Sequence, residues 1–201
     1  MSVSTTEGKI HPHKFAMWVA MASITMMFAG LTSAYVVKQS AGNWRTYSLP
    51  SVFWMSTIVI LISSLTMYLG LKAFKNRAMS RYKMLISLTL ILGVLFGVLQ
   101  YYGFYNLYHQ PQQLILNGSK ENAFMPVKVD GNPSESFLFI ITGLHLLHIL
   151  GGIIALSVVF FRAFRKNVKV YTATGLEVVS AYWHFVDLLW LYLFVFFLAN
   201  Q

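Results

Sequence analysis

Residues 175–199, GLEVVSAYWHFVDLLWLYLFVFFLA, decide the fold of this chain. From Leu176 to Ala199 there are 24 residues, and at about 1.5 Å per residue a helix of that length crosses a bilayer core of roughly 30 Å. The stretch nevertheless contains three ionisable side chains, those of Glu177, His184 and Asp187. An acidic group at the centre of a span costs roughly 2.5 to 3.5 kcal/mol, so such groups normally face a partner rather than lipid. We therefore expect other membrane helices to surround this one.

Four further apolar runs precede this stretch, and each is long enough to span a membrane. The 5 prolines lie outside all of the runs, as expected for helices whose interior amides all donate hydrogen bonds. A transmembrane barrel is excluded because its strands would alternate in polarity, whereas these runs are apolar on every face. The sequence predicts an all-α integral membrane protein, a single domain formed by a bundle of five transmembrane helices at residues 15–37, 52–71, 84–107, 136–161 and 176–199.

The composition narrows the class of protein further. Hydrophobic residues make up 57% of the 201 residues and charged residues only 10%, which is typical of a membrane protein. The absence of cysteine excludes disulfides, iron–sulfur clusters and thiolate-bound copper in this chain. The formal net charge of +9 arises from Lys and Arg residues that lie almost entirely between the apolar runs, so we expect no nucleic-acid partner.

The distribution of Lys and Arg predicts the orientation in the membrane. The side that holds the N-terminus carries eleven of the 15, against four on the other side. The eleven are Lys9, Lys14, Lys72, Lys75, Arg77, Arg81, Lys83, Arg162, Arg165, Lys166 and Lys169, and the four are Lys38, Arg45, Lys120 and Lys128. Because cytoplasmic loops are enriched in Lys and Arg, we expect the N-terminus in the cytoplasm and the C-terminus outside.

Two segments resemble one protein family. The first is Glu177, followed after four residues by Tyr182-Trp183-His184-Phe185-Val186-Asp187, and it is similar to the last-helix signature of the cytochrome c oxidase subunit III family, subunit 3 of the haem-copper terminal oxidases. The second, TGLHLLHILGG at residues 142–152, resembles the preceding helix of that family, with His145 and His148 three residues apart and Gly151 and Gly152 after them. Both occur in the family's order, so the chain resembles a five-helix form of subunit III.

The resemblance implies a subunit without a catalytic centre of its own. Such a chain is a non-redox subunit of a proton-pumping oxidase in an aerobic respiratory chain, and it supports the stability and the proton uptake of catalytic subunit I. Haem and copper then belong to partner subunits, and no cofactor belongs to this chain. The implied partners are subunit I, other oxidase subunits and membrane lipids. The implied location is a bacterial-type inner (cell) membrane, which the chain crosses several times.

Two alternatives stay open beside this interpretation. One is the equivalent subunit of a quinol oxidase, because the electron donor binds elsewhere in the complex. The other is a free-standing proton-linked transporter that uses Glu177, His184 and Asp187 as a proton path. Broken helices or an inverted repeat would favour the transporter, and neither is visible in the sequence.

Two departures limit what the resemblance carries over. Ile24 stands where the corresponding family helix commonly has a glutamate after an Ala-Ser pair, so no proton-buffering role is assigned to that position. Many members have seven spans, and their two extra N-terminal helices help to build a cleft that holds lipid. With five spans in this chain, bound phospholipid is kept as an open expectation.

The intramembrane histidines, His145, His148 and His184, are candidates for binding metal or haem. Their spacing fits neither ligand. A di-haem bundle needs two histidines well apart on each of two helices, and the oxidase copper site needs three histidines that include an adjacent pair. We predict that this chain binds no haem and no copper, and that these are buried, hydrogen-bonded histidines that hold two helices in register.

The two acidic residues have structural interpretations as well. Glu177 lies three residues after Thr174 in a capping-box pattern, so we expect it to cap the helix or to bond to another helix, with a proton-carrying role as the alternative. Counted from the loop between the last two spans, Asp187 and His148 lie nearly level in the membrane. We predict that Asp187 is hydrogen-bonded to His148 or another polar side chain of the bundle, or alternatively to the catalytic subunit.

Small residues at helical spacing indicate where helices approach closely. The pairs are Gly93 with Gly97, Ala16 with Ala20, and Ala29 with Ser33, and the fourth span adds Gly151 and Gly152. We expect these residues to pack helices within the chain, with docking to another subunit as the alternative.

Overall fold

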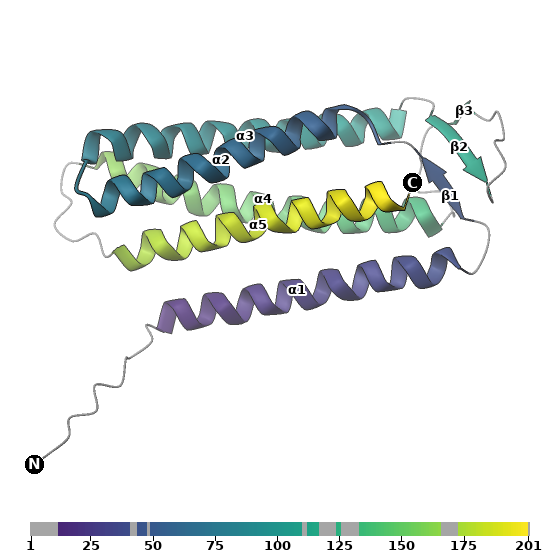
Figure 1. Cartoon of the computed structure of the whole chain (residues 1–201), viewed down its shortest axis with the longest axis horizontal. Helices are drawn as coiled ribbons and strands as arrows, with labels where there is room; N and C mark the ends of the chain where they lie inside the picture. Colours follow the sequence, from purple (N-terminus) through teal and green to yellow (C-terminus); the bar gives the residue numbers. More distant parts are fainter. Residues whose placement is uncertain are drawn as a thin grey trace, which may run out of the picture.

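Five long helices lie side by side along the length of the molecule (Figure 1). The structure is a computed structural model, and it describes residues 12–40, 44–47, 49–109, 112–116, 124–125, 133–165 and 173–200. The helices are α1 (Pro12–Gln39), α2 (Val52–Lys75), α3 (Met79–His109), α4 (Pro133–Phe164) and α5 (Ala173–Ala199). Each is long and apolar enough to cross a membrane, which confirms the predicted helical membrane protein.

The helices extend beyond the apolar runs that predict them. α3 begins at Met79 rather than at residue 84, and α4 ends at Phe164 rather than at residue 161. Lys and Arg are tolerated in the end turns of a membrane helix because their long side chains carry the charge to the membrane surface. An apolar run therefore marks the part of a helix that lies in the bilayer core, and the helix itself continues past it.

α2 and α3 are joined by a turn at residues 76–78, and they pack against each other as neighbours. The amide of Arg77 donates to the carbonyl of Phe74, and the amide of Ala78 donates to the carbonyl of Ala73. This pairing is a Schellman motif, and it places Arg77 in the left-handed region with φ 57°. The Cβ atom of arginine disfavours that conformation, so the turn carries a local cost of about 1 kcal/mol.

α5 contacts all four of the other helices, because it packs on α1, α2 and α4 and its Trp183 reaches Gly93 of α3. α1 packs on α4 and α5, and the large side chains that it buries are those of Met21, Phe28 and Tyr35. The small residues of α1 are exposed instead, namely Ala16, Ala20, Ala29 and Ser33. The prediction that these two pairs pack helices within the chain is therefore wrong, because the large residues of α1 occupy its inward face.

A small antiparallel sheet lies at the end of the bundle opposite to the start of α1 (Figure 1). Its strands, in the spatial order β1-β2-β3, are β1 (Arg45–Tyr47), β2 (Gln112–Leu116) and β3 (Phe124–Met125). Thr46 pairs with Ile115, and Gln113 pairs with Phe124. The sequence pattern predicts no strand here, because segments of two to five residues are too short to show a period. The sheet joins the α1–α2 connection to the α3–α4 connection.

Candidate functional site

Trp183 is a central contact of the bundle interior. It lies on α5 with 1% of its surface exposed, and its ring lies against Gly93 of α3 and Gly152 of α4. A Cβ atom at Gly93 would come within 2.7 Å of the ring, and one at Gly152 within 3.1 Å. The indole Nε1 donates a hydrogen bond to Ser63 Oγ of α2, at 3.2 Å. This one side chain of the predicted motif therefore contacts three helices besides its own.

Tyr182 and Trp190 of α5 also form hydrogen bonds with neighbouring helices. The hydroxyl of Tyr182 donates to the backbone carbonyl of His148 on α4, at 3.0 Å, and Trp190 Nε1 donates to Thr57 Oγ1 on α2, at 3.0 Å. Beside the first of these bonds, a Cβ atom at Gly151 would lie 3.6 Å from the Tyr182 hydroxyl, an ordinary contact. Gly97 is likewise loosely surrounded, with 3.9 Å from such an atom to a methyl group of α4.

Two of the three membrane histidines have hydrogen bonds. His184 Nδ1 lies 2.6 Å from Ser64 Oγ, which links α5 to α2 as predicted. His148 Nδ1 lies 2.7 Å from the carbonyl oxygen of Leu144, one turn earlier on the same helix. The hydrogen bond predicted between helices is therefore absent at this nitrogen, because the imidazole of His148 bonds to a carbonyl of its own helix instead.

His145 differs from both, because it is buried without a hydrogen bond. Its ring stacks on Trp190 with centroids 5.5 Å apart and an interplanar angle of 20°, and it makes an edge contact with Phe28 of α1. In the part of the chain that the structure describes, neither ring nitrogen has a hydrogen-bond partner. The prediction of a hydrogen-bonded histidine is wrong here, since aromatic packing takes its place.

Asp187 is turned into the bundle, with 3% of its surface exposed. Neither carboxylate oxygen has a hydrogen-bond partner among the described residues. The Ser64 hydroxyl is near enough to interact with this carboxyl group, but its own hydrogen bond joins it to His184. The predicted bond between Asp187 and His148 is wrong. Equal depth does not give two residues the same face, and the ring of His148 packs against Phe28 instead.

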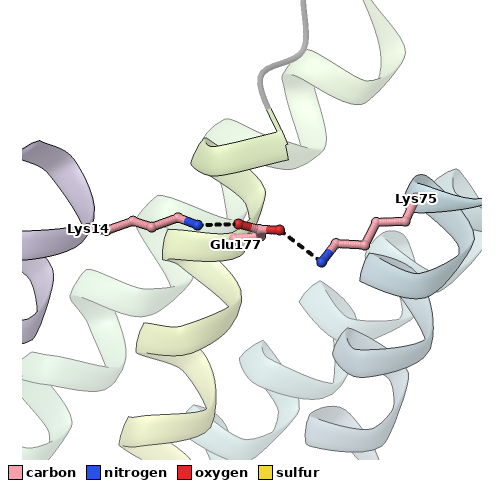
Figure 2. A network of polar contacts seen from close by, with 3 residues as sticks. All are labelled: Lys14, Lys75 and Glu177. Atoms are coloured by element: carbon pink, nitrogen blue, oxygen red, sulfur yellow. Dashed lines mark hydrogen bonds and ion pairs between the residues drawn. The ribbon is translucent and has the colours of Figure 1, made fainter. Parts of the chain in front are cut away.

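Glu177 joins three helices at the end of the bundle where α5 begins (Figure 2). Its Oε2 lies 2.7 Å from Lys14 Nζ of α1, and its Oε1 lies 2.8 Å from Lys75 Nζ of α2. Of the two structural roles predicted for Glu177, bonding to other helices is the one observed. The capping box is not, because Thr174 lies inside α5 and both carboxylate oxygens are turned sideways to the lysines.

Several polar side chains of the interior join α2 to α5. Over the residues that the structure describes, no group of three or more His, Cys, Asp or Glu side chains is placed to hold a metal ion. The α2 hydroxyls that form hydrogen bonds with α5 were missed by sequence reasoning, although a polar residue inside an apolar run was an available signal. They are Thr57, Ser63 and Ser64. Lys14 and Lys75 were missed as partners of Glu177, and their places at the ends of apolar runs were the signal there.

Comparison with known proteins supports the resemblance to the subunit III family. Residues 120–199 match the family model described as cytochrome c oxidase subunit III. The cytochrome c oxidase subunit 3 of Bacillus subtilis (strain 168) is 27% identical over 195 residues, which cover 94% of this chain and 86% of the relative. The probable cytochrome c oxidase subunit 3 of Nocardia farcinica (strain IFM 10152) is 30% identical over 179 residues, which cover 87% and 81%.

A relative with a different electron donor in its name is also similar. The cytochrome bo(3) ubiquinol oxidase subunit 3 of Buchnera aphidicola subsp. Acyrthosiphon pisum (strain APS) is 26% identical over 208 residues, which cover 99% of this chain and 93% of the relative. The similarity therefore extends over nearly the full length of both chains, and it includes all five helices.

Proposed function

The chain belongs to the cytochrome c oxidase subunit III family, and on that premise we propose that it is the non-redox subunit III of a proton-pumping haem-copper terminal oxidase. In this role it packs against catalytic subunit I and supports the stability and proton uptake of that subunit. The proposal rests on the hydrogen bonds that the family motif of α5 forms with other helices. Tyr182, Trp183 and His184 each bond to another helix, so the motif serves to hold a helical scaffold together.

The chain has no catalytic centre in this proposal. Haem and copper lie in partner subunits, and the residues of this chain bind and orient helices. Tagging the chain and purifying it from membranes tests the proposal. A stoichiometric haem-containing partner is expected, whereas a protein that purifies alone would favour the free-standing transporter.

Cytochrome c is the proposed electron donor of the complex, and quinol is the alternative. Relatives named for each of the two donors are similar to this chain over most of its length. The two candidates differ in a partner subunit, because a cytochrome c oxidase carries a cysteine-ligated copper pair outside this chain. The copper content and the paramagnetic resonance spectrum of the purified complex distinguish the donors, since the quinol enzyme lacks that pair.

We place the chain in a bacterial-type inner membrane with the start of α1 in the cytoplasm and Gln201 outside. The excess of Lys and Arg at the Lys14 end of the bundle supports this orientation. Reporter fusions at Gln201 and in the turn at Arg77 test it. Activity of a cytoplasmic reporter at Gln201 would reverse the topology.

A bound phospholipid is part of the same proposal. A pocket between α1 and α5 opens at the Glu177 end and joins charged groups to an apolar wall that includes Met17, Trp18 and Met21. The ammonium of Lys14 donates one hydrogen bond to Glu177, its remaining N–H groups suit a headgroup phosphate, and the apolar wall suits an acyl chain. Mass spectrometry of lipid retained by the purified complex tests this, with Lys14→Gln expected to lower the retained amount.

A further inference from the structure

His148 has a hydrogen-bond acceptor in the middle of the membrane that the described part of the chain does not use. It lies 15 residues after Pro133 and 16 residues before Phe164, so it is about 22 to 24 Å from either end of α4. Its Nδ1 is 2.7 Å from the carbonyl oxygen of Leu144. A carbonyl only accepts, so Nδ1 carries a proton in this hydrogen bond, and in an imidazole with a single proton Nε2 offers a lone pair.

Beside the contact of its ring with Phe28 of α1, His148 lies on a partly exposed side of α4. Leu144, His148, Gly151 and Ala155 follow one another at helical spacing along one side of α4, and all four are exposed or half-exposed. A Cβ atom at Gly151 would meet only an ordinary contact of 3.6 Å, so the glycine is not needed for packing inside the chain. Glycine at a helix surface lets a second backbone approach closely, which brings side chains of that helix within reach of the imidazole.

The donor for Nε2 has to come from a protein at this depth. Acyl chains have no hydrogen-bond donor, and lipid headgroups and bulk water begin roughly 15 Å from the middle of the membrane, since the hydrocarbon core is roughly 30 Å thick. An unused polar group in hydrocarbon is costly, which favours a partner that satisfies it.

We propose that this side of α4, from Leu144 to Ala155, docks a transmembrane helix of the catalytic subunit, and that a hydroxyl, amide or indole group of that helix donates a hydrogen bond to His148 Nε2. The inference rests on the proposed function, since it assigns a face to the subunit contact. The polar complementarity of one acceptor and one donor then fixes the relative depth of the two helices.

The test measures how firmly the chain stays bound to its haem-containing partner as detergent concentration rises. His148→Leu is expected to weaken association by about threefold to eighteenfold, which corresponds to ~0.6 to 1.7 kcal/mol for a hydrogen bond between membrane helices. His148→Gln, which keeps an acceptor at similar reach, is expected to restore most of the binding. Gly151→Leu is expected to weaken association by blocking close approach.

Gly30 of α1 supplies the matched control. It is exposed, and a Cβ atom there meets nothing within 4 Å, so Gly30→Leu adds the same bulk on a different helix. Retention equal to wild type in Gly30→Leu but not in Gly151→Leu supports the docking face. Wild-type retention in both His148→Leu and Gly151→Leu overturns it. If His148→Leu does not accumulate in membranes, Gly151→Leu decides the matter. A wild-type chain that never co-purifies with haem refutes the proposed function itself, which is a separate result.

Discussion

The substitution Gly93→Ala tests the packing of Trp183 most directly. The added Cβ atom would lie 2.7 Å from Cη2 and 2.9 Å from Cζ2 of the indole, well inside the ~3.5 Å at which carbon atoms normally touch. The ring cannot easily move away from Gly93. On its other side a Cβ atom at Gly152 would lie only 3.1 Å from it, and its Nε1 is hydrogen-bonded to Ser63. Overpacking of this kind costs about 1 to 3 kcal/mol, and the better helix propensity of alanine returns at most ~1 kcal/mol.

We therefore expect Gly93→Ala to lower the free energy of unfolding by about 1 to 2 kcal/mol. Gly97→Ala is the matched control one turn along α3, where the nearest atom is 3.9 Å away, and it should be neutral or slightly stabilising. Unfolding in mixed micelles, followed by indole fluorescence, measures both. Equal stability of the two variants would refute the packing argument.

A double-mutant cycle isolates the contact itself. Trp183→Phe removes the outer ring of the indole, so alanine at residue 93 should cost less in that background, with a coupling energy of about 1 kcal/mol or more. An unchanged cost of Gly93→Ala in the Trp183→Phe background would place the effect elsewhere in α3.

Three further substitutions test other features of the structure. Glu177→Gln removes two ion pairs at a side chain that is 26% exposed, so it should lower the free energy of unfolding by about 0.5 to 1.5 kcal/mol at low salt, and the loss should shrink in about 1 M salt. A loss that salt leaves unchanged would mean that ion pairing is not its cause. Arg77→Gly relieves the left-handed backbone at φ 57° and should raise the melting temperature, by the equivalent of about 0.5 to 1 kcal/mol, whereas a lower melting temperature would contradict the strain assigned to the turn. Asp187→Asn replaces a carboxyl group that has no hydrogen-bond partner among the described residues, so stability should change by less than about 1 kcal/mol in the isolated chain. A loss above about 2 kcal/mol would reveal a bond that the described residues do not show.

The membrane helices were predictable because their signal is length. An apolar run of about 20 residues has one common structure in a bilayer, and five such runs gave five helices. The contacts between helices were harder to predict, because depth along a helix is read from residue number but rotation about the helix axis is not. His148 and Asp187 show the difference, since they lie nearly level and face different neighbours.

Rotation also explains the small residues of α1. Ala29 and Ser33 have the spacing of a packing pair, but the helix turns its larger residues inward and exposes these two. A spacing pattern identifies a face that permits close approach and does not identify the helix that approaches it. The glycines differ in the same way, because Gly93 lies tightly against Trp183 while Gly97 lies in ordinary contact with Ile153.

The order of the helices along the chain has a consequence for biogenesis. A ribosome delivers α1 to α4 before the last helix, and during that interval Gly93 and Gly152 have no indole between them and Ser63 lacks its donor. Lys14 and Lys75 also lack their ion pairs with Glu177 during that interval. The interior is therefore completed only after α5 has been synthesised. A protein truncated before Ala173 would have the four helices α1 to α4 without α5 between them, so residues that normally contact α5 would be left without that contact.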